Sequence, residues 1–305
     1  MVTSVDGILN INKPWGKTSF SIVSLVRRLS GEKRVGHAGT LDPAATGVLP
    51  VCLGQGTRII QFLLEAPKAY RAEIELGVAT DTHDATGTVV SRGDPSGVSR
   101  EKLLSALDSF RGPIEQTPPM YSAVKHGGKP LYELARSGIE VERKSRLRWV
   151  YRLELLDWQP PVATIEVECS KGTYIRSLAD DLGQLLGCGA NLKNLARLKC
   201  GLFTIEDAIT VPQLEDGFRH GYWQQFLYPI DIVLSRWGAV VVDDAAAEDI
   251  KNGRPLALEA ADNPPPSVPG NRCRVYTRDG TFLAMLCFDS EKGLWQPEKV
   301  FATDR

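Results

Sequence analysis

Hydrophobic patterning in the first 64 residues predicts a strand, a helix, a strand-containing loop region and a second helix. An apolar run over 7–14 ends at a proline, which is typical of a short strand. From Thr18 onward the apolar residues recur at helical spacing, and Gly31 marks the end of that helix. The glycine-rich stretch 35–56 favours ordered loop and strand, and 57–64 favours a second helix.

The middle of the chain mixes strand and helix patterns without regular alternation. Residues 70–77 alternate with period two and predict a half-buried strand, with 86–90 as its hairpin partner across the polar turn 81–87. Further patterns predict helices over 100–110 and 173–186 and strands over 146–156 and 162–169. We therefore predict an α+β fold with a mixed, largely antiparallel sheet.

The character of the sequence changes near Ser235. An acidic stretch over 243–249 is followed by a turn at 252–253, and short strands over 272–277 and 281–288 are joined at Asp279-Gly280 as a hairpin. We predict a main domain over 1–234 and a small β-rich domain over 235–305.

Composition adds few constraints. The chain has 305 residues, 43% hydrophobic and 24% charged, which suits a globular protein of two domains. Its net charge of -1 means that a nucleic-acid partner would need a local basic patch. The six cysteines include no C-x-x-C pair and predict buried free thiols. No apolar run reaches the roughly 18 residues of a membrane helix, and no signal peptide is apparent, so we predict a cytoplasmic protein without a membrane partner.

The sequence does not match the motifs of several common functional sites. Gly16-Lys17-Thr18 resembles the end of a phosphate-binding loop, but Ile11 stands where that motif requires glycine. The turn holding Asp81, His83 and Asp84 lacks a nearby histidine or cysteine cluster that would complete a metal site, and it predicts a solvated turn. No histidine accompanies a nucleophile elbow, so serine hydrolase chemistry has little support. We expect no metal and no cofactor.

The more informative segment is 36–49, Gly-His-Ala-Gly-Thr-Leu-Asp-Pro-Ala-Ala-Thr-Gly-Val-Leu, which sets the single carboxylate of Asp42 among glycines and apolar residues. The residues alone favour a turn or helix-cap aspartate, because Asp-Pro commonly initiates turns. A catalytic carboxylate is the alternative.

The same segment closely resembles the catalytic motif of the TruB-type tRNA pseudouridine synthases. Residues 7–14 with 18–20 resemble the opening motif of that family, 68–72 with 76–77 its second and 169–183 its third, so the likeness spans roughly 7–198. The resemblance implies a pseudouridine synthase catalytic domain followed by a PUA-like domain. The implied activity is the conversion of uridine 55 in the tRNA T-loop to pseudouridine.

The resemblance also assigns roles to residues of the site. Asp42 becomes the nucleophile or essential carboxylate, Arg176 its ion-pair partner, and Tyr70 the residue that packs on the target base and takes part in proton transfer. Such an arginine would keep Asp42 ionised, since an opposite charge favours the charged form. The implied nucleotide-binding residues are His37, which fills the space left by the flipped nucleotide, and Tyr174 and Leu195, which line the uridine pocket.

Taken without the resemblance, these residues have plainer interpretations. Arg176 is spaced to pair with Asp180 on the same helix, and Tyr70 and Tyr174 would be ordinary packing residues.

Two basic clusters supply the local patch that an RNA partner needs, although either alone could be a solvated face. One includes Lys125 and Lys129 within 125–152, and the other lies between Lys13 and Arg34. By resemblance, about 120–150 forms an insertion that clamps the T-arm of tRNA, and we expect Lys13, Lys125 and Lys129 to contact RNA.

Two other functions share these binding features. One is a non-catalytic RNA chaperone, and the other is a synthase directed to different uridines by an RNA partner. The sequence does not choose between a covalent sugar adduct and a glycal intermediate. A monomer is the simplest expectation.

Overall fold

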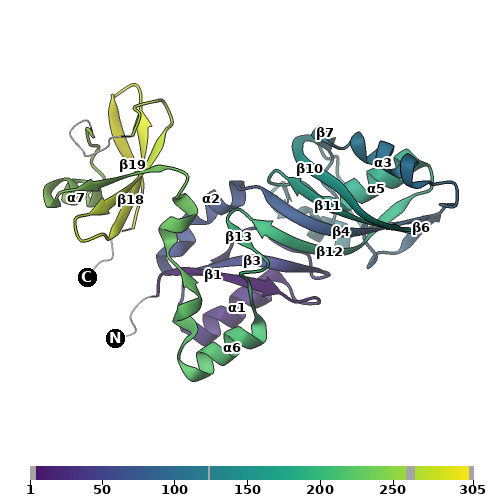
Figure 1. Ribbon diagram of the computed structural model, residues 1–305, viewed down its shortest axis with the longest axis horizontal. Coiled ribbons are helices and arrows are strands. Elements are labelled where there is room, and N and C mark those ends of the chain that lie inside the picture. Colours follow the sequence, from purple (N-terminus) through teal and green to yellow (C-terminus); the bar gives the residue numbers. More distant parts are fainter. Residues whose placement is uncertain (1–4, 123, 259–264, 302–305) are drawn as a thin grey trace.

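The computed structural model describes residues 5–122, 124–258 and 265–301. Within them the chain forms a large mixed sheet of eleven strands and a separate four-stranded sheet near the C-terminus (Figure 1). The predicted α+β class, the mixed and largely antiparallel sheet and the small C-terminal β domain are confirmed.

The helical elements comprise seven α-helices and three short 3-10 turns in the described residues. They are α1 (Ser19–Ser30), η1 (Gly54–Ile59), α2 (Ile60–Glu65), α3 (Arg100–Asp108), α4 (Leu131–Arg136), α5 (Ile175–Leu186), α6 (Val211–His220), η2 (Trp223–Phe226), η3 (Ile230–Leu234) and α7 (Asp244–Lys251).

The strands divide between the main part of the chain and the C-terminal domain. Those of the main part are β1 (Gly7–Lys13), β2 (Val35–His37), β3 (Ala45–Leu53), β4 (Lys68–Leu76), β5 (Val78–Thr80), β6 (Val89–Arg92), β7 (Gly112–Gln116), β8 (Lys125–His126), β9 (Lys129–Pro130), β10 (Arg146–Gln159), β11 (Val162–Cys169), β12 (Ala190–Cys200), β13 (Phe203–Thr204), β14 (Ile209–Thr210) and β15 (Leu227–Tyr228). Those of the C-terminal domain are β16 (Gly238–Val242), β17 (Arg272–Thr277), β18 (Phe282–Asp289) and β19 (Leu294–Val300).

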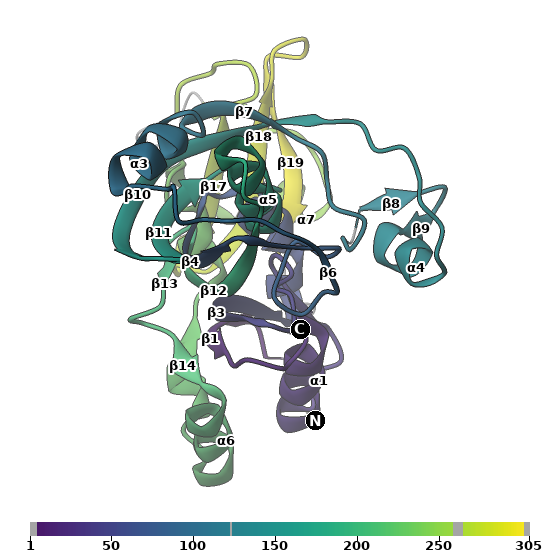
Figure 2. The ribbon, with the colours of Figure 1, turned by 90° about the vertical axis from the view of Figure 1, so that its right-hand side faces the viewer.

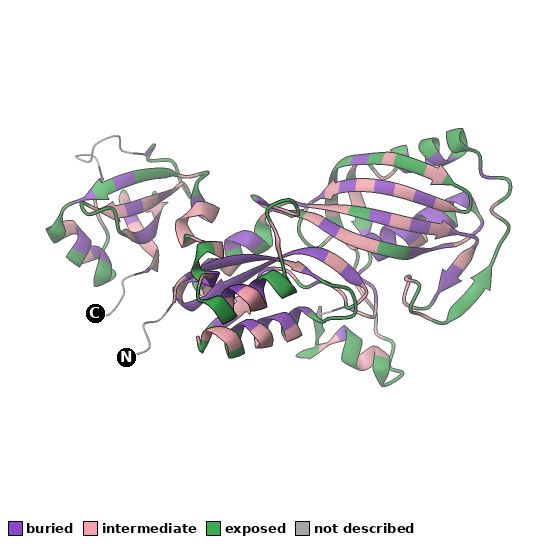
Figure 3. Ribbon diagram, turned by 60° about the horizontal axis from the view of Figure 1, so that its bottom comes forward, coloured by how far each residue is buried: buried purple, intermediate pink, exposed green. Residues whose placement is uncertain are grey.

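The large sheet joins two halves through one central strand. Its order is β14-β1-β3-β12-β4-β11-β10-β7, and β12 pairs in parallel with β3 on one side and antiparallel with β4 on the other. Helices α3 and α5 pack on the β4–β11–β10 half, and α1 and α6 pack on the β1–β3 half. Figure 3 shows strands of the sheet banded by burial, as expected where one face is covered. The junction of the halves is where the candidate site lies.

Helix boundaries follow the cap residues that the sequence indicated. Thr18 caps α1 by accepting a hydrogen bond from the Ser21 amide at 3.0 Å, and Gly31 ends the helix in the left-handed region at φ 71°. Gly187 ends α5 in the same way, at φ 77°.

The predicted hairpin partner of the 70–77 strand is wrong. Strand β4 lies between β11 and β12, and β6 pairs instead with the short strand β5. Gly77, at φ 89°, ends β4 and turns the chain away from the sheet, so the following strands form a separate ribbon.

The central strand β12 was not predicted at all. Its register shifts between Leu192 and Asn194 and again between Arg197 and Lys199, so its buried positions do not alternate with period two. A second omission is α7, where the acidic stretch forms a helix capped by Asp243.

The C-terminal domain packs against the main domain through an apolar cluster. Phe62 of α2 meets Trp237 edge to face at 5.4 Å between ring centroids, and Met285 and Phe301 belong to the same cluster. This contact lies on the α2 side of the large sheet.

The described residues contain no helix that is both long and apolar enough to cross a membrane. All six cysteines are free thiols, and only Cys287 is not fully buried, which confirms the prediction of buried free thiols.

Gly183 allows α5 to approach the start of β12 closely, and this makes a stability test possible. A Cβ at this position would lie 2.2 Å from the Ala190 amide nitrogen, which is backbone and cannot move aside. We expect Gly183→Ala to lower the free energy of unfolding by about 1–3 kcal/mol or more, although alanine is favoured over glycine in helices by about 1 kcal/mol. Chemical denaturation measures the change.

Gly97→Ala is the matched control, because a Cβ at Gly97 meets nothing within 4 Å. A Gly183→Ala variant as stable as the Gly97→Ala variant would show that the helix and strand can separate at little cost.

Candidate active site

The loop carrying Asp42 connects β2 to β3 and is fixed to the start of α1. The Gly16 amide donates to the Pro43 carbonyl at 2.8 Å, and the Leu41 amide donates to the Ser19 hydroxyl at 2.9 Å. These bonds hold the loop so that Asp42 reaches across to the other half of the sheet. The Asp42 carbonyl accepts from the Ala45 amide at 3.0 Å, so the turn that Asp-Pro predicts is present, whereas no helix-cap bond of the carboxylate occurs among the described residues.

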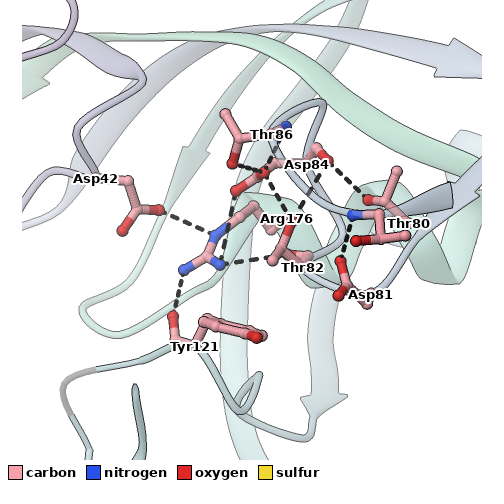
Figure 4. A network of polar contacts seen from close by, with 9 residues as sticks. Asp42, Thr80, Asp81, Thr82, Asp84, Thr86, Tyr121 and Arg176 are labelled. Carbon is pink, nitrogen blue, oxygen red and sulfur yellow. Dashed lines mark hydrogen bonds and ion pairs between the residues drawn. The ribbon is translucent and has the colours of Figure 1, made fainter. Parts of the chain in front are cut away.

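Asp42 forms an ion pair with Arg176, with 2.9 Å between Oδ2 and Nε (Figure 4). Arg176 lies in the first turn of α5 and is only 5% exposed. Its Nη2 donates to the Tyr121 carbonyl at 2.8 Å and its Nη1 to the Thr82 carbonyl at 3.3 Å. The guanidinium is therefore held on several sides, and its predicted pairing with Asp42 is present. The alternative pairing with Asp180 is not among the ion pairs of the described residues.

Asp84 is a second carboxylate beside the guanidinium, so the prediction of a solvated turn holds for the exposed Asp81 but is wrong for Asp84. Its Oδ2 lies 3.8 Å from Nη1 of Arg176, and its side chain is 15% exposed. Its Oδ1 accepts from the Thr82 hydroxyl at 2.8 Å and from the amide and hydroxyl of Thr86 at 2.9 and 2.6 Å (Figure 4). The turn thus positions Arg176. In the sequence this turn was visible only as a cluster of polar residues without an assigned role.

The ion pair opens into a cavity of about 290 Å³ at the junction of the two sheet halves. Three predicted nucleotide-contacting residues line it from three elements, namely Tyr70 of β4, Leu195 of β12 and Tyr174 before α5. The buried Gln116 fixes Tyr174 by accepting from its amide at 3.0 Å and donating to its carbonyl at 3.1 Å. The cavity offers a carboxylate, a cation and aromatic side chains on one small surface.

Burial shifts the pKa of two titratable groups that line this cavity. Desolvation raises the pKa of Asp42 above that of an ordinary carboxyl, and the charge of Arg176 opposes this shift without cancelling it. We expected Arg176 to keep Asp42 ionised. Its charge does lower the pKa of Asp42, but the desolvation that raises this pKa is the larger of the two effects. Burial also raises the pKa of Tyr70 to about 12, so its phenol is protonated at neutral pH.

Two family models match the chain, with the descriptions TruB family pseudouridylate synthase (N terminal domain) over residues 27–175 and tRNA pseudouridylate synthase B C-terminal domain over residues 176–235. A tRNA pseudouridine synthase B of Dehalococcoides mccartyi (strain CBDB1) is 46% identical over 297 residues, which cover 97% of each chain. The chain belongs to the TruB family of pseudouridylate synthases.

Other comparisons agree with membership in the TruB family. A tRNA pseudouridine synthase B of Symbiobacterium thermophilum is 49% identical over 254 residues, covering 82% of this chain and 83% of that one. A crystal structure of a Cbf5-Nop10-Gar1 complex matches with a TM-score of 0.75 and 29% identity, covering 97% of this chain and 85% of that one. An H/ACA RNP bound to a substrate RNA containing 2′-deoxyuridine matches with a TM-score of 0.73 and 26% identity, covering 97% and 85%.

The prediction that Lys13 contacts RNA is wrong for this TruB-family chain. Lys13 is 0% exposed, and its ammonium donates to the carbonyls of Pro14, Lys17 and Pro43 at 3.0, 2.6 and 3.3 Å. It joins the end of β1 to the loop that carries Asp42. A cation whose donors are used inside the protein is not available to a phosphate.

Lys68 and Arg197 also line the cavity, and the sequence assigned neither of them a role. The Lys68 ammonium donates to the carbonyls of Leu63, Leu64 and Ala66, at 2.6 to 3.0 Å. Arg197 is 1% exposed and donates to the Val48 carbonyl at 2.6 Å and the Gly39 carbonyl at 3.0 Å. Both are buried cations that bond to backbone carbonyls, at the end of α2 and in and before β3, and such a cation leaves no spacing pattern in a sequence.

The remaining predicted residues lie outside the cavity. His37 is in β2, is not among the lining residues, and has a pKa lowered by burial, with a further contribution from Arg197. Lys125 and Lys129 are exposed on the β8–β9 hairpin, which projects with α4 to one side of the molecule (Figure 2). Their roles toward RNA stay predictions. In the described residues no group of three His, Cys, Asp or Glu side chains is placed to hold a metal.

Lys13 gives a pH-dependent test of how the loop is held. Burial lowers its pKa to about 8, against about 10.4 in an unfolded chain. Between these values the unfolded state binds more protons, so stability contributed at this site increases as pH rises. We expect the unfolding free energy of the wild type, minus that of Lys13→Met, to grow by up to about 3 kcal/mol from pH 7 to 10.5.

The exposed Lys33→Met is the control, and its difference from the wild type should stay flat over the same range. A flat difference for Lys13→Met as well would mean that the ammonium is not desolvated. Denaturant titrations at several pH values provide both curves.

Proposed function

We propose that this chain isomerises uridine 55 in the T-loop of tRNA to pseudouridine. The observation that carries the proposal is the Asp42–Arg176 ion pair at the mouth of a cavity that Tyr70, Tyr174 and Leu195 line. Membership of the TruB family and relatives with the name tRNA pseudouridine synthase B support the choice of reaction and substrate.

The reaction breaks the bond from ribose C1′ to N1 of uracil and forms a bond from C1′ to C5. In the proposed mechanism Asp42 acts on the ribose, either by attacking C1′ or by removing the C2′ proton. The freed base rotates in the cavity, C5 bonds to C1′, and the proton leaving C5 is balanced by one gained at N1. Substrate and product are isomers, so the balance needs no oxidant, reductant or co-substrate, and we propose a reaction without a cofactor.

The cavity suits a base removed from its stack. Flipping a nucleotide out of a structured RNA costs a few kcal/mol, and stacking on an aromatic side chain such as Tyr70 returns about 1–3 kcal/mol. Because Tyr70 is protonated at neutral pH, its phenol enters the reaction as a hydrogen-bond donor. Arg176 orients Asp42 and stabilises its carboxylate form during attack.

The T-arm of tRNA is the proposed partner of the excursion between β7 and β10. This segment carries Lys125 and Lys129 on its exposed hairpin, and its root supplies the Tyr121 carbonyl that binds Arg176. We take the active form to be a monomer, because Asp42, Arg176, Tyr70 and Leu195 of a single chain already form the proposed site. Action on tRNA supports a cytoplasmic location.

Replacing the carboxylate of Asp42 tests the mechanism. We expect Asp42→Asn to reduce pseudouridine formation on unmodified tRNA by at least about 10³-fold, because the amide can neither attack the ribose nor remove its proton. Affinity for tRNA should stay within about threefold, because phosphates, stacking and shape dominate binding. Nucleotide-resolution mapping of pseudouridine and a filter-binding titration give the two readouts.

Asp94→Asn, on an exposed turn, is the matched control and should keep full turnover. Turnover retained in Asp42→Asn would remove the mechanism. A wild-type protein that binds tRNA without modifying it would point to the RNA chaperone. Conversion that persists when uridine 55 is replaced would point to other target uridines.

Changing Lys125 and Lys129 together to alanine tests the proposed RNA contact of the hairpin. Each lost phosphate contact lowers the slope of log affinity against log salt by roughly 0.7–0.9. We therefore expect weaker tRNA binding and a slope reduced by up to about 1.8. Lys102→Ala on α3 is the control, and a double variant with the slope of this control would contradict the assignment.

A further inference from the structure

A groove of about 590 Å³ lies between α1 and α6, apart from the active-site cavity. We call it the α1–α6 groove. It shares no lining residue with the cavity, and the side where these two helices lie faces forward in Figure 3. Its lining includes Pro14, Lys17, Phe20, Leu25, Arg28 and Glu215.

Two aromatic side chains beside this groove are unusually exposed. Trp15 is 69% exposed and Phe20 is 65% exposed, the largest fractions among the exposed large hydrophobic side chains of the described residues. Phe20 lines the groove, and Trp15 lies between two of its lining residues, Pro14 and Lys17. Neither belongs to a core cluster, so the packing of the fold does not account for their exposure.

The charges of the groove favour an anionic occupant. Lys17 and Arg28 line it against one carboxylate, Glu215. Neither cation is in an ion pair within the part of the chain that the structure describes. Exposed aromatic rings interspersed with free cations are typical of surfaces that bind unpaired nucleotides, where bases stack and phosphates are neutralised.

The groove is rigidly connected to the catalytic loop. Lys13 binds the carbonyls of Lys17 and Pro43, and the Gly16 amide binds Pro43 as well. Trp15 and Phe20 therefore keep a fixed position relative to Asp42. The segment that carries both rings is thus bonded directly to the residue that follows Asp42, Pro43.

We propose that Trp15 and Phe20 stack on unpaired bases of the RNA substrate other than the target uridine, while Lys17 and Arg28 contact the adjoining phosphates. The inference rests on the proposed function, because it takes the substrate to be a folded RNA with unpaired nucleotides near the flipped one. An apolar protein helix would also cover the rings but would leave two unpaired cations at its edge.

Substitutions that separate stacking from simple apolar contact test this site. Trp15→Leu and Phe20→Leu keep an apolar side chain but remove the ring, and each should weaken binding of unmodified tRNA by at least about fivefold. Trp15→Phe and Phe20→Tyr keep the ring and should bind within about twofold of wild type. Leu185→Ala, at a position 56% exposed on α5, is the control and should not weaken binding.

Intrinsic fluorescence adds a direct readout. We expect tRNA to quench tryptophan emission in the wild type and the quenching to fall in Trp15→Phe, because an exposed indole that stacks on a base is quenched. Quenching of equal size in both proteins would overturn the proposal.

The remaining outcomes are also decisive. Leucine variants that bind tRNA like the wild type would overturn the inference, as would an equal loss in Leu185→Ala. So would leucine variants that alter self-association of the RNA-free protein and leave tRNA affinity unchanged. If the wild type makes no pseudouridine yet shows Trp15-dependent binding, the proposed function fails and this site stands. If it makes pseudouridine and the leucine variants bind normally, only this inference fails.

Discussion

The ion pair between Asp42 and Arg176 is the contact on which the arrangement of this site depends. It joins the loop before β3 to the first turn of α5, segments that belong to opposite halves of the large sheet. A buried guanidinium without partners would be strongly unfavourable, and here two backbone carbonyls and a second carboxylate, Asp84, complete its surroundings. The geometry of this ion pair is therefore a property of the junction of the halves and not of either half alone.

Buried lysines and arginines complete that junction. Lys13, Lys68 and Arg197 each direct their donors to backbone carbonyls, which lie in the loop around Lys17, in the last turn of α2 and in β3, respectively. Long cationic side chains serve here as internal cross-links between loops. This use explains how a cavity walled largely by loops keeps a defined shape.

Much of the fold could be predicted from the sequence, because cap residues and hydrophobic alternation determine helix ends and strands locally. Thr18, Gly31 and Gly187 marked helix ends, and alternation located β4 and β11. Strand β12 escaped because its two register shifts remove alternation, although it is central to the sheet. Residues of the candidate site could be predicted only where they belong to a sequence motif that resembles one of the family. Asp42 and Arg176 were found in this way, whereas Asp84 and Gln116 act through contacts with residues distant in sequence.

The excursion between β7 and β10 has an inner and an outer end with different tasks. Its outer end is the exposed hairpin of β8 and β9, and its inner end carries the Tyr121 carbonyl that binds the guanidinium of Arg176. The contact with Arg176 depends only on the path of the chain at the root, so a change of sequence at the tip leaves that contact in place. In the proposed function, one short excursion thus meets the RNA at its outer end and, through a single peptide oxygen at its inner end, holds the guanidinium beside Asp42.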